Sequence, residues 1–260
     1  MSRAFARAQS LKPPSFMFAS FALALQFLTR FPLNIKTEFS DKRLGQSVLF
    51  YPIIGLLIGC FLAVLAYFLP PHAITLNAAL ILTLWVLITG GLHLDGLADC
   101  SDAWAGGLGD KTRSLAIMKD PAAGPIAVII LILLLLLKWS ALQQLLSSKQ
   151  VLLPLLVAPF LARLSILILM LSTPYIRENG LGSAMQQHLP KQLALIITTI
   201  ALTACAWLFS IYIVLSILFI IAGIRYLALQ RIQGITGDVY GASVEIIEAA
   251  VLINWVLFYG

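Results

Sequence analysis

Long apolar runs dominate the chain, and their lengths set the first expectation about its fold. Largely apolar segments cover about residues 48–69, 73–97, 125–146 and 151–172. A helix rises about 1.5 Å per residue, so about 20 apolar residues cross the hydrocarbon core of a bilayer. These four segments are therefore predicted to be transmembrane helices.

The second half of the chain adds three more predicted spans. Residues 192–229 stay apolar for nearly twice the length of a span, which fits two helices that meet tightly near Phe209 and Ser210. A last span is predicted over residues 243–258. The run 16–28 is short for a full span, so we expect an interfacial or partly inserted helix there. The prediction is an all-α, polytopic membrane helix bundle of about seven spans, between six and eight.

Composition agrees with a membrane protein and argues against other classes. Of 260 residues, 60% are hydrophobic and 11% are charged, which lies outside the usual range of soluble domains. The net charge is +6, but no aromatic–basic motif accompanies it, so no nucleic-acid partner is predicted. The distant cysteines Cys60, Cys100 and Cys205 predict neither a disulfide nor a zinc site. Without a repeat or a linker, residues 1–260 are expected to form one domain.

The positions of Lys and Arg predict the orientation in the membrane, because short cytoplasmic loops are enriched in both. If the segment before residue 48 is cytoplasmic, fourteen of the seventeen Lys and Arg residues fall on that side. Lys138 and Lys149 are assigned to the opposite side, and Arg163 lies within a span. The same orientation places the acidic stretches 95–120 and 230–248 together on the cytoplasmic side.

Acidic residues are concentrated in two short regions, since eight of the eleven fall within 95–120 and 238–248. On a helix, Asp95, Asp99 and Asp102 lie within an arc of about 60°, so three like charges share one face. Such charges repel unless a cation lies between them. Carboxylate oxygens suit Mg²⁺, or less often Mn²⁺. A divalent metal site is therefore the hypothesis; ordinary interfacial charges at helix ends are the alternative.

The second acidic region has the same character. Asp238, Glu245 and Glu248 lie within about 80° on a helix. Gly241 and Ala242 share that face, and small residues let a second helix or a ligand approach closely. Charges cost a few kcal/mol inside a membrane, so they tend to occur in pairs, cavities or functional sites.

Several other residues could carry chemistry. Lys119 and the backbone N–H groups that follow it could hold phosphate oxygens, although the segment could also be a plain helix entry at Pro125. Arg163 is expected to face an acid or a bound phosphate, because an unpaired arginine inside a membrane is costly. His93 could be a base, a ligand or an interior histidine. Thr236 could cap the helix that follows it.

Taken together, the two acidic regions and the residues described above resemble the pattern of the cobalamin synthase family, the adenosylcobinamide-GDP ribazoletransferases. The resemblance runs from about residue 25 to the C-terminus, and its most specific block is Gly-Leu-His-Leu-Asp-Gly-Leu-Ala-Asp at residues 91–99. After Asp99 the family commonly has Thr-Ala-Asp-Gly, where this chain has Cys100-Ser101-Asp102-Ala103 and so keeps the acid but not the glycine. The other matching segments are Leu28-Thr29-Arg30-Phe31-Pro32, Met118-Lys119-Asp120, Ala158-Pro159 with Arg163, and Gly237-Asp238 with Gly241-Ala242 and Glu245.

The resemblance implies a reaction that assembles the nucleotide loop of vitamin B12. Adenosylcobinamide-GDP and α-ribazole, or its 5′-phosphate, give adenosylcobalamin, or its 5′-phosphate, and GMP, with Mg²⁺ required. It also implies a bacterial or archaeal cytoplasmic membrane and an active site that faces the cytoplasm. A homo-oligomer and association with other enzymes of the pathway both stay open.

Roles for individual residues follow from this chemistry, since charge gathers on phosphoryl and leaving oxygens during the transfer. Mg²⁺ is assigned to Asp95, Asp99, Asp102, Asp238 and Glu245. Phosphate contacts are assigned to Lys119, Arg163 and, more weakly, Arg30. A general base is optional, and His93, Asp120 and Glu248 stay open as candidates.

Two other functions compete with this hypothesis. A CDP-alcohol phosphotransferase also places spaced aspartates and a divalent metal at a helix end, but its longer signature needs Ala-Arg where this chain has Ala98-Asp99. A cation or proton transporter could use the acids as a pathway, but such sites usually lie near the bilayer midplane within repeated halves. A purely structural membrane subunit would leave both acidic regions unexplained.

Overall fold

The structure is a computed structural model, and it describes residues 16–31, 40–178 and 180–259. Pro32 and the basic residues Arg3, Arg7, Lys12 and Lys36 lie outside the described residues. Within these ranges the regular elements are helices, as predicted, with one isolated β-bridge between Tyr175 and Ile235. The helices are α2 (Phe16–Leu28), α3 (Asp41–Ser47), the 3₁₀ turn η2 (Val48–Phe50), α4 (Tyr51–Phe68), α5 (Ile74–Thr89), α6 (Leu92–Gly106), α7 (Lys111–Ile117), α8 (Pro125–Ser147), α9 (Leu152–Ser172), α10 (Leu181–Gln187), α11 (Lys191–Leu208), α12 (Ile211–Ile232) and α13 (Gly237–Tyr259).

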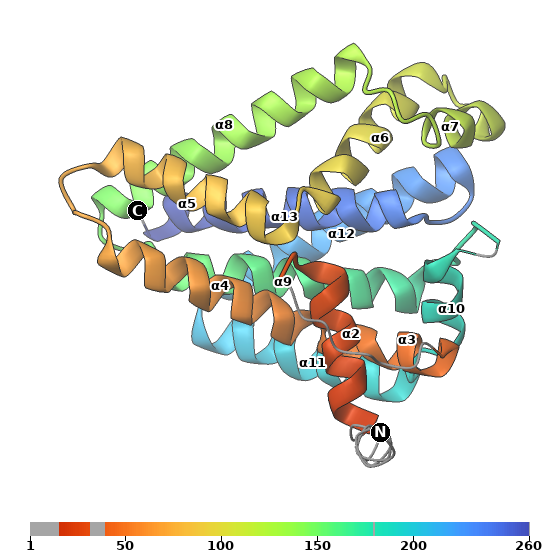
Figure 1. Cartoon of the computed structure of the whole chain (residues 1–260), viewed down its shortest axis with the longest axis horizontal. Helices are drawn as coiled ribbons and strands as arrows, with labels where there is room; N and C mark the ends of the chain where they lie inside the picture. Colours follow the sequence, from red (N-terminus) through yellow and green to blue (C-terminus); the bar gives the residue numbers. More distant parts are fainter. Residues whose placement is uncertain (1–15, 32–39, 179, 260) are drawn as a thin grey trace, which may run out of the picture.

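Helix α9 lies at the centre of the bundle, where it packs against both α4 and α13 (Figure 1). Two glycines of α4 allow the close approach. A Cβ atom on Gly59 would lie 2.5 Å from the carbonyl oxygen of Leu155, and one on Gly55 would collide with the carbonyl of Pro159. Pro159 has no N–H to donate to the Leu155 carbonyl within α9. That carbonyl oxygen faces Gly59 of α4, where the absence of a side chain leaves room for it.

The predicted number of spans agrees with the structure. Six segments are long and apolar enough to cross a membrane, and the bent pair α5 and α6 raises the number to seven if it counts as one span. Residues 41–68 form one such segment, and α8, α9, α11, α12 and α13 are the others. The long run 192–229 does divide into two helices at Phe209 and Ser210. The run 16–28 is helical, and its depth in the membrane stays a prediction.

The expectation of one continuous span over 73–97 is wrong. Helix α5 ends at Thr89, and α6 starts at Leu92 after a bend of 88°. Gly90 (φ 64°) and Gly91 (φ 71°) adopt the left-handed conformation at the bend, which glycine reaches without steric cost. Asp95, Asp99 and Asp102 therefore lie on a separate helix, α6, whose axis is bent away from that of α5.

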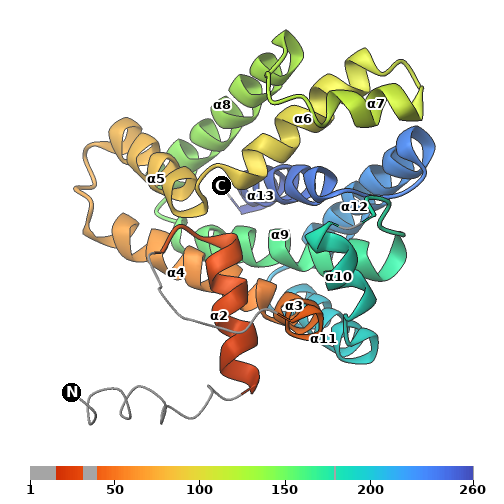
Figure 2. The same ribbon diagram turned by 45° about the vertical axis from the view of Figure 1, so that its right-hand side comes forward.

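The ends of several helices gather at one end of the bundle, away from the C-terminus and the α4–α5 turn. Figures 1 and 2 show α7 beside the end of α6, and α3 beside α10. Lys111 at the start of α7 donates a hydrogen bond to Gln233 at the end of α12, with a distance of 3.0 Å. Residues 111 and 233, which belong to the two predicted acidic stretches, therefore lie side by side, and the side of the membrane that they face stays a prediction.

Candidate functional site

Asp95, Asp99 and Asp102 lie on α6, and α13 brings a fourth aspartate, Asp238, to them. The contact depends on Gly96, because a Cβ atom there would lie only 2.7 Å from the carbonyl oxygen of Asp238. Asp238 is in the first turn of α13. Its position is fixed by the preceding Thr236, which caps the helix as predicted by accepting a hydrogen bond from the Val239 N–H at 3.4 Å.

Negative charge prevails around Asp99. This half-buried carboxylate feels the charges of Asp238, Asp95 and Asp102, and Arg177 is the one cation among the groups that act on it most. Asp95 is exposed. Asp99 thus lies among three further carboxylates and one arginine, which leaves a net negative charge that a divalent cation would neutralise.

Asp102 has a second task, which the sequence did not reveal. Its carboxylate accepts hydrogen bonds from the backbone N–H groups of Gly124 and of Ala127, the latter at 2.9 Å. Both donors belong to the first turn of α8, which carries free N–H groups and the positive end of the helix dipole. Asp102 thus holds α8 against α6 while it contributes charge to the aspartate group.

Arg177 is the main site residue that the sequence analysis missed. Its guanidinium Nη2 lies 2.6 Å from Asp238 Oδ2. The backbone next to it is held by the β-bridge, in which Ile176 donates to the carbonyl of Ile235 at 3.1 Å and Ile235 donates to the carbonyl of Pro174 at 2.9 Å. From sequence, an arginine after a span was explained by membrane orientation alone, so nothing pointed to its partner.

A cavity of about 330 Å³ opens beside the aspartates. Its polar lining includes Asp95, Asp238, Arg177 and His93. The imidazole of His93 is only 3% exposed, and its Nδ1 has no hydrogen-bond partner among the described residues. The cavity therefore joins the negatively charged group to a neutral interior with an available histidine nitrogen.

Glu245 and Glu248 belong to a different cluster, deep in the bundle. Lys138 Nζ lies 2.6 Å from Glu245 Oε2 and 2.6 Å from Glu248 Oε2. Arg163 Nη1 pairs with Glu248 Oε1, which also accepts a hydrogen bond from Trp85 Nε1 at 3.2 Å. Two cations thus balance two anions, as charges inside a membrane protein require.

This buried tetrad, Lys138, Arg163, Glu245 and Glu248, changes three expectations. Lys138 is 2% exposed and pairs with acids inside the bundle, so counting it among the charges on the opposite side of the membrane was wrong. Arg163 faces an acid, one of its two predicted partners, and is fully buried. Glu245 pairs with Lys138 inside the bundle, and it is not among the charges that act most on Asp99. The structure therefore does not bring Glu245 together with the four aspartates.

The remaining candidates lie near the surface. Lys119 and Asp120 are exposed, and the Asp120 carboxylate accepts the Ala122 N–H at 2.9 Å within its own turn. Arg30 is exposed, and its side chain lies against Gly90 at the bend between α5 and α6. Cys60, Cys100 and Cys205 are free thiols, of which Cys60 is exposed and the other two are buried.

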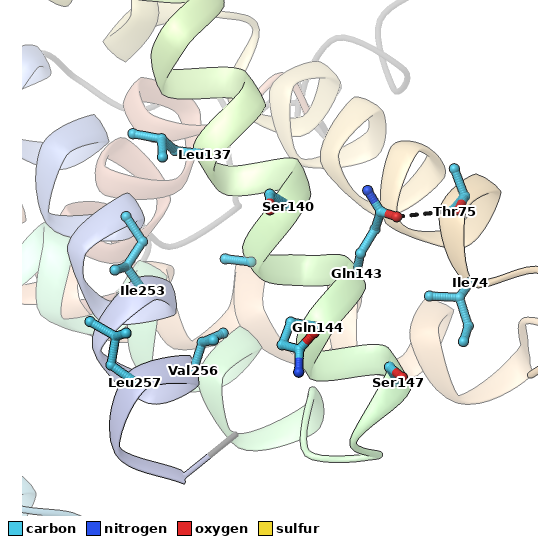
Figure 3. A pocket seen from close by; sticks show the side chains of 11 residues that line it. Ile74, Thr75, Leu137, Ser140, Gln143, Gln144, Ser147, Ile253, Val256 and Leu257 are labelled. Atoms are coloured by element: carbon cyan, nitrogen blue, oxygen red, sulfur yellow. Dashed lines mark hydrogen bonds between the residues drawn. The ribbon is translucent and has the colours of Figure 1, made fainter.

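A second cavity, of about 650 Å³, lies at the other end of the bundle between α5, α8 and α13 (Figure 3). Its lining is uncharged: hydroxyl and amide groups of α5 and α8 face apolar side chains of α13. Thr75 and Gln143 are joined across it by a hydrogen bond of 3.2 Å (Figure 3). This cavity therefore lacks the charged groups that line the cavity beside the aspartates.

The four aspartates fit a hard divalent cation by donor chemistry rather than by a closed cage. Within residues 16–31, 40–178 and 180–259, no group of three or more His, Cys, Asp or Glu side chains has the spacing of a formed metal site. Mg²⁺ commonly takes only one or two carboxylates and completes its shell with water and substrate phosphates. An open, oxygen-only, negatively charged group is the arrangement that this mode of binding uses.

The chain is similar to known proteins over nearly its whole length. The model of a family described as cobalamin-5-phosphate synthase matches residues 20–256. The adenosylcobinamide-GDP ribazoletransferase of Pseudomonas aeruginosa is 48% identical over 237 residues, which cover 90% of this chain and 96% of that protein. Proteins of the same name from Pseudomonas fluorescens (45% over 241 residues; 92% and 99% covered) and Acinetobacter baumannii (42% over 243 residues; 93% and 98% covered) are similar as well. No solved structure matches the chain.

Proposed function

This chain belongs to the cobalamin-5-phosphate synthase family, and on that premise we propose that it is an Mg²⁺-dependent adenosylcobinamide-GDP ribazoletransferase embedded in the bacterial cytoplasmic membrane. The observation that carries the proposal is the group of four aspartates from α6 and α13, with Arg177 beside it and a cavity adjoining it. A displacement at a diphosphate needs a metal site, a cation and a place for the nucleophile. These three elements meet at one end of the bundle.

In the proposed reaction, a ribose hydroxyl of α-ribazole, or of its 5′-phosphate, attacks the phosphorus nearer cobinamide in adenosylcobinamide-GDP. The new P–O bond joins cobinamide phosphate to the ribose. The bond from that phosphorus to the bridging oxygen breaks, and the oxygen leaves as part of GMP. The hydroxyl proton passes to a base or to water. Family membership favours this chemistry over a CDP-alcohol phosphotransferase or a transporter.

Asp95, Asp99 and Asp238 are the residues that would hold Mg²⁺, with Asp102 adding charge from its place at the start of α8. When bound, Mg²⁺ supplies neutralisation of the charge that develops on the phosphoryl and leaving oxygens. Asp95 is the most accessible of these carboxylates. Glu245 is left out of the set because Lys138 already neutralises it.

Arg177 is the cation best placed for the diphosphate, since it lines the same cavity as Asp95 and Asp238. Its planar guanidinium can hold two phosphate oxygens at once. Lys119 and Arg30 are exposed and could contact the outer part of the substrate. Arg163 is fully buried in its pair with Glu248, so we assign it to the tetrad rather than to phosphate.

Among the three candidate bases, His93 has the best position. Glu248 is held by Lys138 and Arg163, and Asp120 is exposed in its own turn. His93 lines the cavity and has a ring nitrogen without a partner among the described residues. A neutral imidazole there can accept the proton of the attacking hydroxyl.

The activity is tested with protein purified in detergent and supplied with adenosylcobinamide-GDP, α-ribazole and Mg²⁺. We expect GMP release that depends on both substrates and stops when the metal is chelated. A folded preparation that releases no GMP with both substrates present would exclude the proposed function. Release without α-ribazole would indicate a hydrolase instead.

The proposed orientation is tested by labelling of a single cysteine. Thr112 is exposed on α7 at the aspartate end of the bundle. In a background with Cys60→Ser, Thr112→Cys is expected to react with an impermeant maleimide only after the cytoplasmic face is opened. Labelling of intact cells would place the aspartates on the opposite side.

A further inference from the structure

The cavity beside the aspartates has a second, aromatic part that the metal chemistry does not use. Tyr175 and Tyr240 stack with ring centroids 6.2 Å apart and planes 18° apart. Phe27 and Tyr51 stack in the same way at 6.1 Å and 14°. All four rings line the cavity, which they share with Asp95 and other polar groups. One compartment thus joins an aromatic surface to the charged group.

One buried hydroxyl in this cavity lacks a partner. Tyr240 is 6% exposed, and its hydroxyl makes no hydrogen bond to any described residue. A buried donor without an acceptor is costly, so such a group commonly marks a place that a ligand fills. The neighbouring Tyr175 is likewise uncharged at neutral pH, as tyrosine ordinarily is, and burial raises its pKa further. The aromatic part therefore offers donors and ring faces, and no charge.

The size of the cavity limits which part of the two substrates can occupy it. About 330 Å³ lies at the lower end of small-molecule pockets, which run from about 300 to 1,000 Å³. A corrinoid is several times bulkier than a nucleoside and does not fit. Guanine also fits by size, but the carboxylates that could accept from its N–H groups, Asp95 and Asp238, belong to the part of the cavity assigned to the metal, and the aromatic part would leave those N–H groups unpaired. The benzimidazole of α-ribazole has an apolar ring system and a single free ring nitrogen, which is an acceptor.

Resting on the proposed function, we infer that this cavity is the subsite for the aromatic base of α-ribazole. The base lies against the Tyr175–Tyr240 pair, and the Tyr240 hydroxyl donates a hydrogen bond to its free ring nitrogen. The ribose then extends toward Asp95, Asp238 and His93, where its hydroxyl meets the diphosphate. The corrinoid remains outside the cavity.

Two variants test this subsite from different elements. Tyr240→Phe removes the hydroxyl and keeps the ring. Leu181→Trp fills the cavity from α10, where Leu181 is 57% exposed and its replacement leaves the core untouched. The matched controls are Tyr226→Phe and Leu193→Trp, at exposed positions on α12 and α11. KM is measured separately for each substrate, and binding of labelled α-ribazole is measured without the cobinamide substrate.

Both site variants are expected to raise the KM for α-ribazole about tenfold, equivalent to about 1.4 kcal/mol. The KM for adenosylcobinamide-GDP is expected to change less than about twofold, and the controls are expected to behave as wild type. Wild type is also expected to prefer α-ribazole to the analogue with an indole in place of the benzimidazole, and Tyr240→Phe to lose that preference.

Other outcomes separate the inference from the function on which it rests. If the variants raise only the KM for adenosylcobinamide-GDP, guanine or cobinamide occupies the cavity and the inference is wrong. If neither KM changes, the base binds elsewhere. If wild type makes no GMP but binds α-ribazole, and Leu181→Trp does not, the subsite stands while the proposed reaction fails.

Discussion

The ion pairs of the buried tetrad predict how much stability the protein loses when each charged residue is replaced. Lys138 contacts two carboxylates, whereas Glu245 has Lys138 as its ionic partner and Glu248 also holds Arg163. The perturbations are Lys138→Met, Glu245→Gln and the double variant. Each single change leaves one uncompensated charge inside the bundle, and the double change leaves the neutral pair of Arg163 and Glu248.

Breaking a buried pair by removal of one partner costs about 3–5 kcal/mol. Lys138→Met should reach that range, because Glu245 then has no cation at 2.6 Å. Glu245→Gln should cost less, about 1–3 kcal/mol, because Lys138 keeps Glu248 and an amide can still accept its hydrogen bond. The double variant should be more stable than Lys138→Met alone, which requires a coupling energy between the two residues that exceeds the cost of Glu245→Gln.

The assay is unfolding by SDS in mixed micelles, followed by loss of helical circular dichroism for wild type and the three variants. A double variant whose loss equals the sum of the two single losses would refute the pairing of Lys138 with Glu245. The same proteins test the exclusion of Glu245 from the metal site. Glu245→Gln should leave the Mg²⁺ concentration for half-maximal activity unchanged, and a large increase would return Glu245 to the ligand set.

Two further variants probe the contact between α6, α13 and Arg177. Arg177→Met should raise the KM for adenosylcobinamide-GDP about tenfold, because the diphosphate loses a guanidinium partner. It should lower the Mg²⁺ concentration for half-maximal activity, because Asp238 loses its cation at 2.6 Å. A rise in both quantities would indicate a merely structural role for Arg177. Gly96→Ala should destabilise the protein by about 1–3 kcal/mol through the clash with Asp238 and reduce turnover. Gly223→Ala is its control, since open space surrounds that helical glycine and alanine there should stabilise by about 0.5–1 kcal/mol. Equal stability of the two alanine variants would contradict the close approach.

Most of the fold follows from segment length and apolar content. Six spans, the division of 192–229 and the helix over 16–28 were predictable because each depends on local sequence. The bend at Gly90 and Gly91 was not, since two glycines inside an apolar run are compatible with a continuous span. The break shows only in the left-handed φ values of the two glycines, which the sequence does not give.

The candidate site was predictable in part, for a similar reason. Helical spacing places Asp95, Asp99 and Asp102 on one face, and the charge pattern brings Asp238 to the same end of the bundle. Partners that depend on tertiary contacts were beyond reach. Lys138 and Arg177 were both explained by membrane orientation, because neither carries a local mark of the carboxylate that it contacts.

The most direct test of the central claim is the turnover of Asp99→Asn beside that of Asp41→Asn. Asp99 lies within the aspartate group, whereas Asp41 is exposed in the first turn of α3 and has no place in the proposed site. The change removes one charge and keeps the shape of the side chain. We expect Asp99→Asn to fold like wild type and to lose GMP release by at least about a hundredfold, with Asp41→Asn fully active. Wild-type turnover in a folded Asp99→Asn protein would contradict the assignment of the aspartates to the reaction.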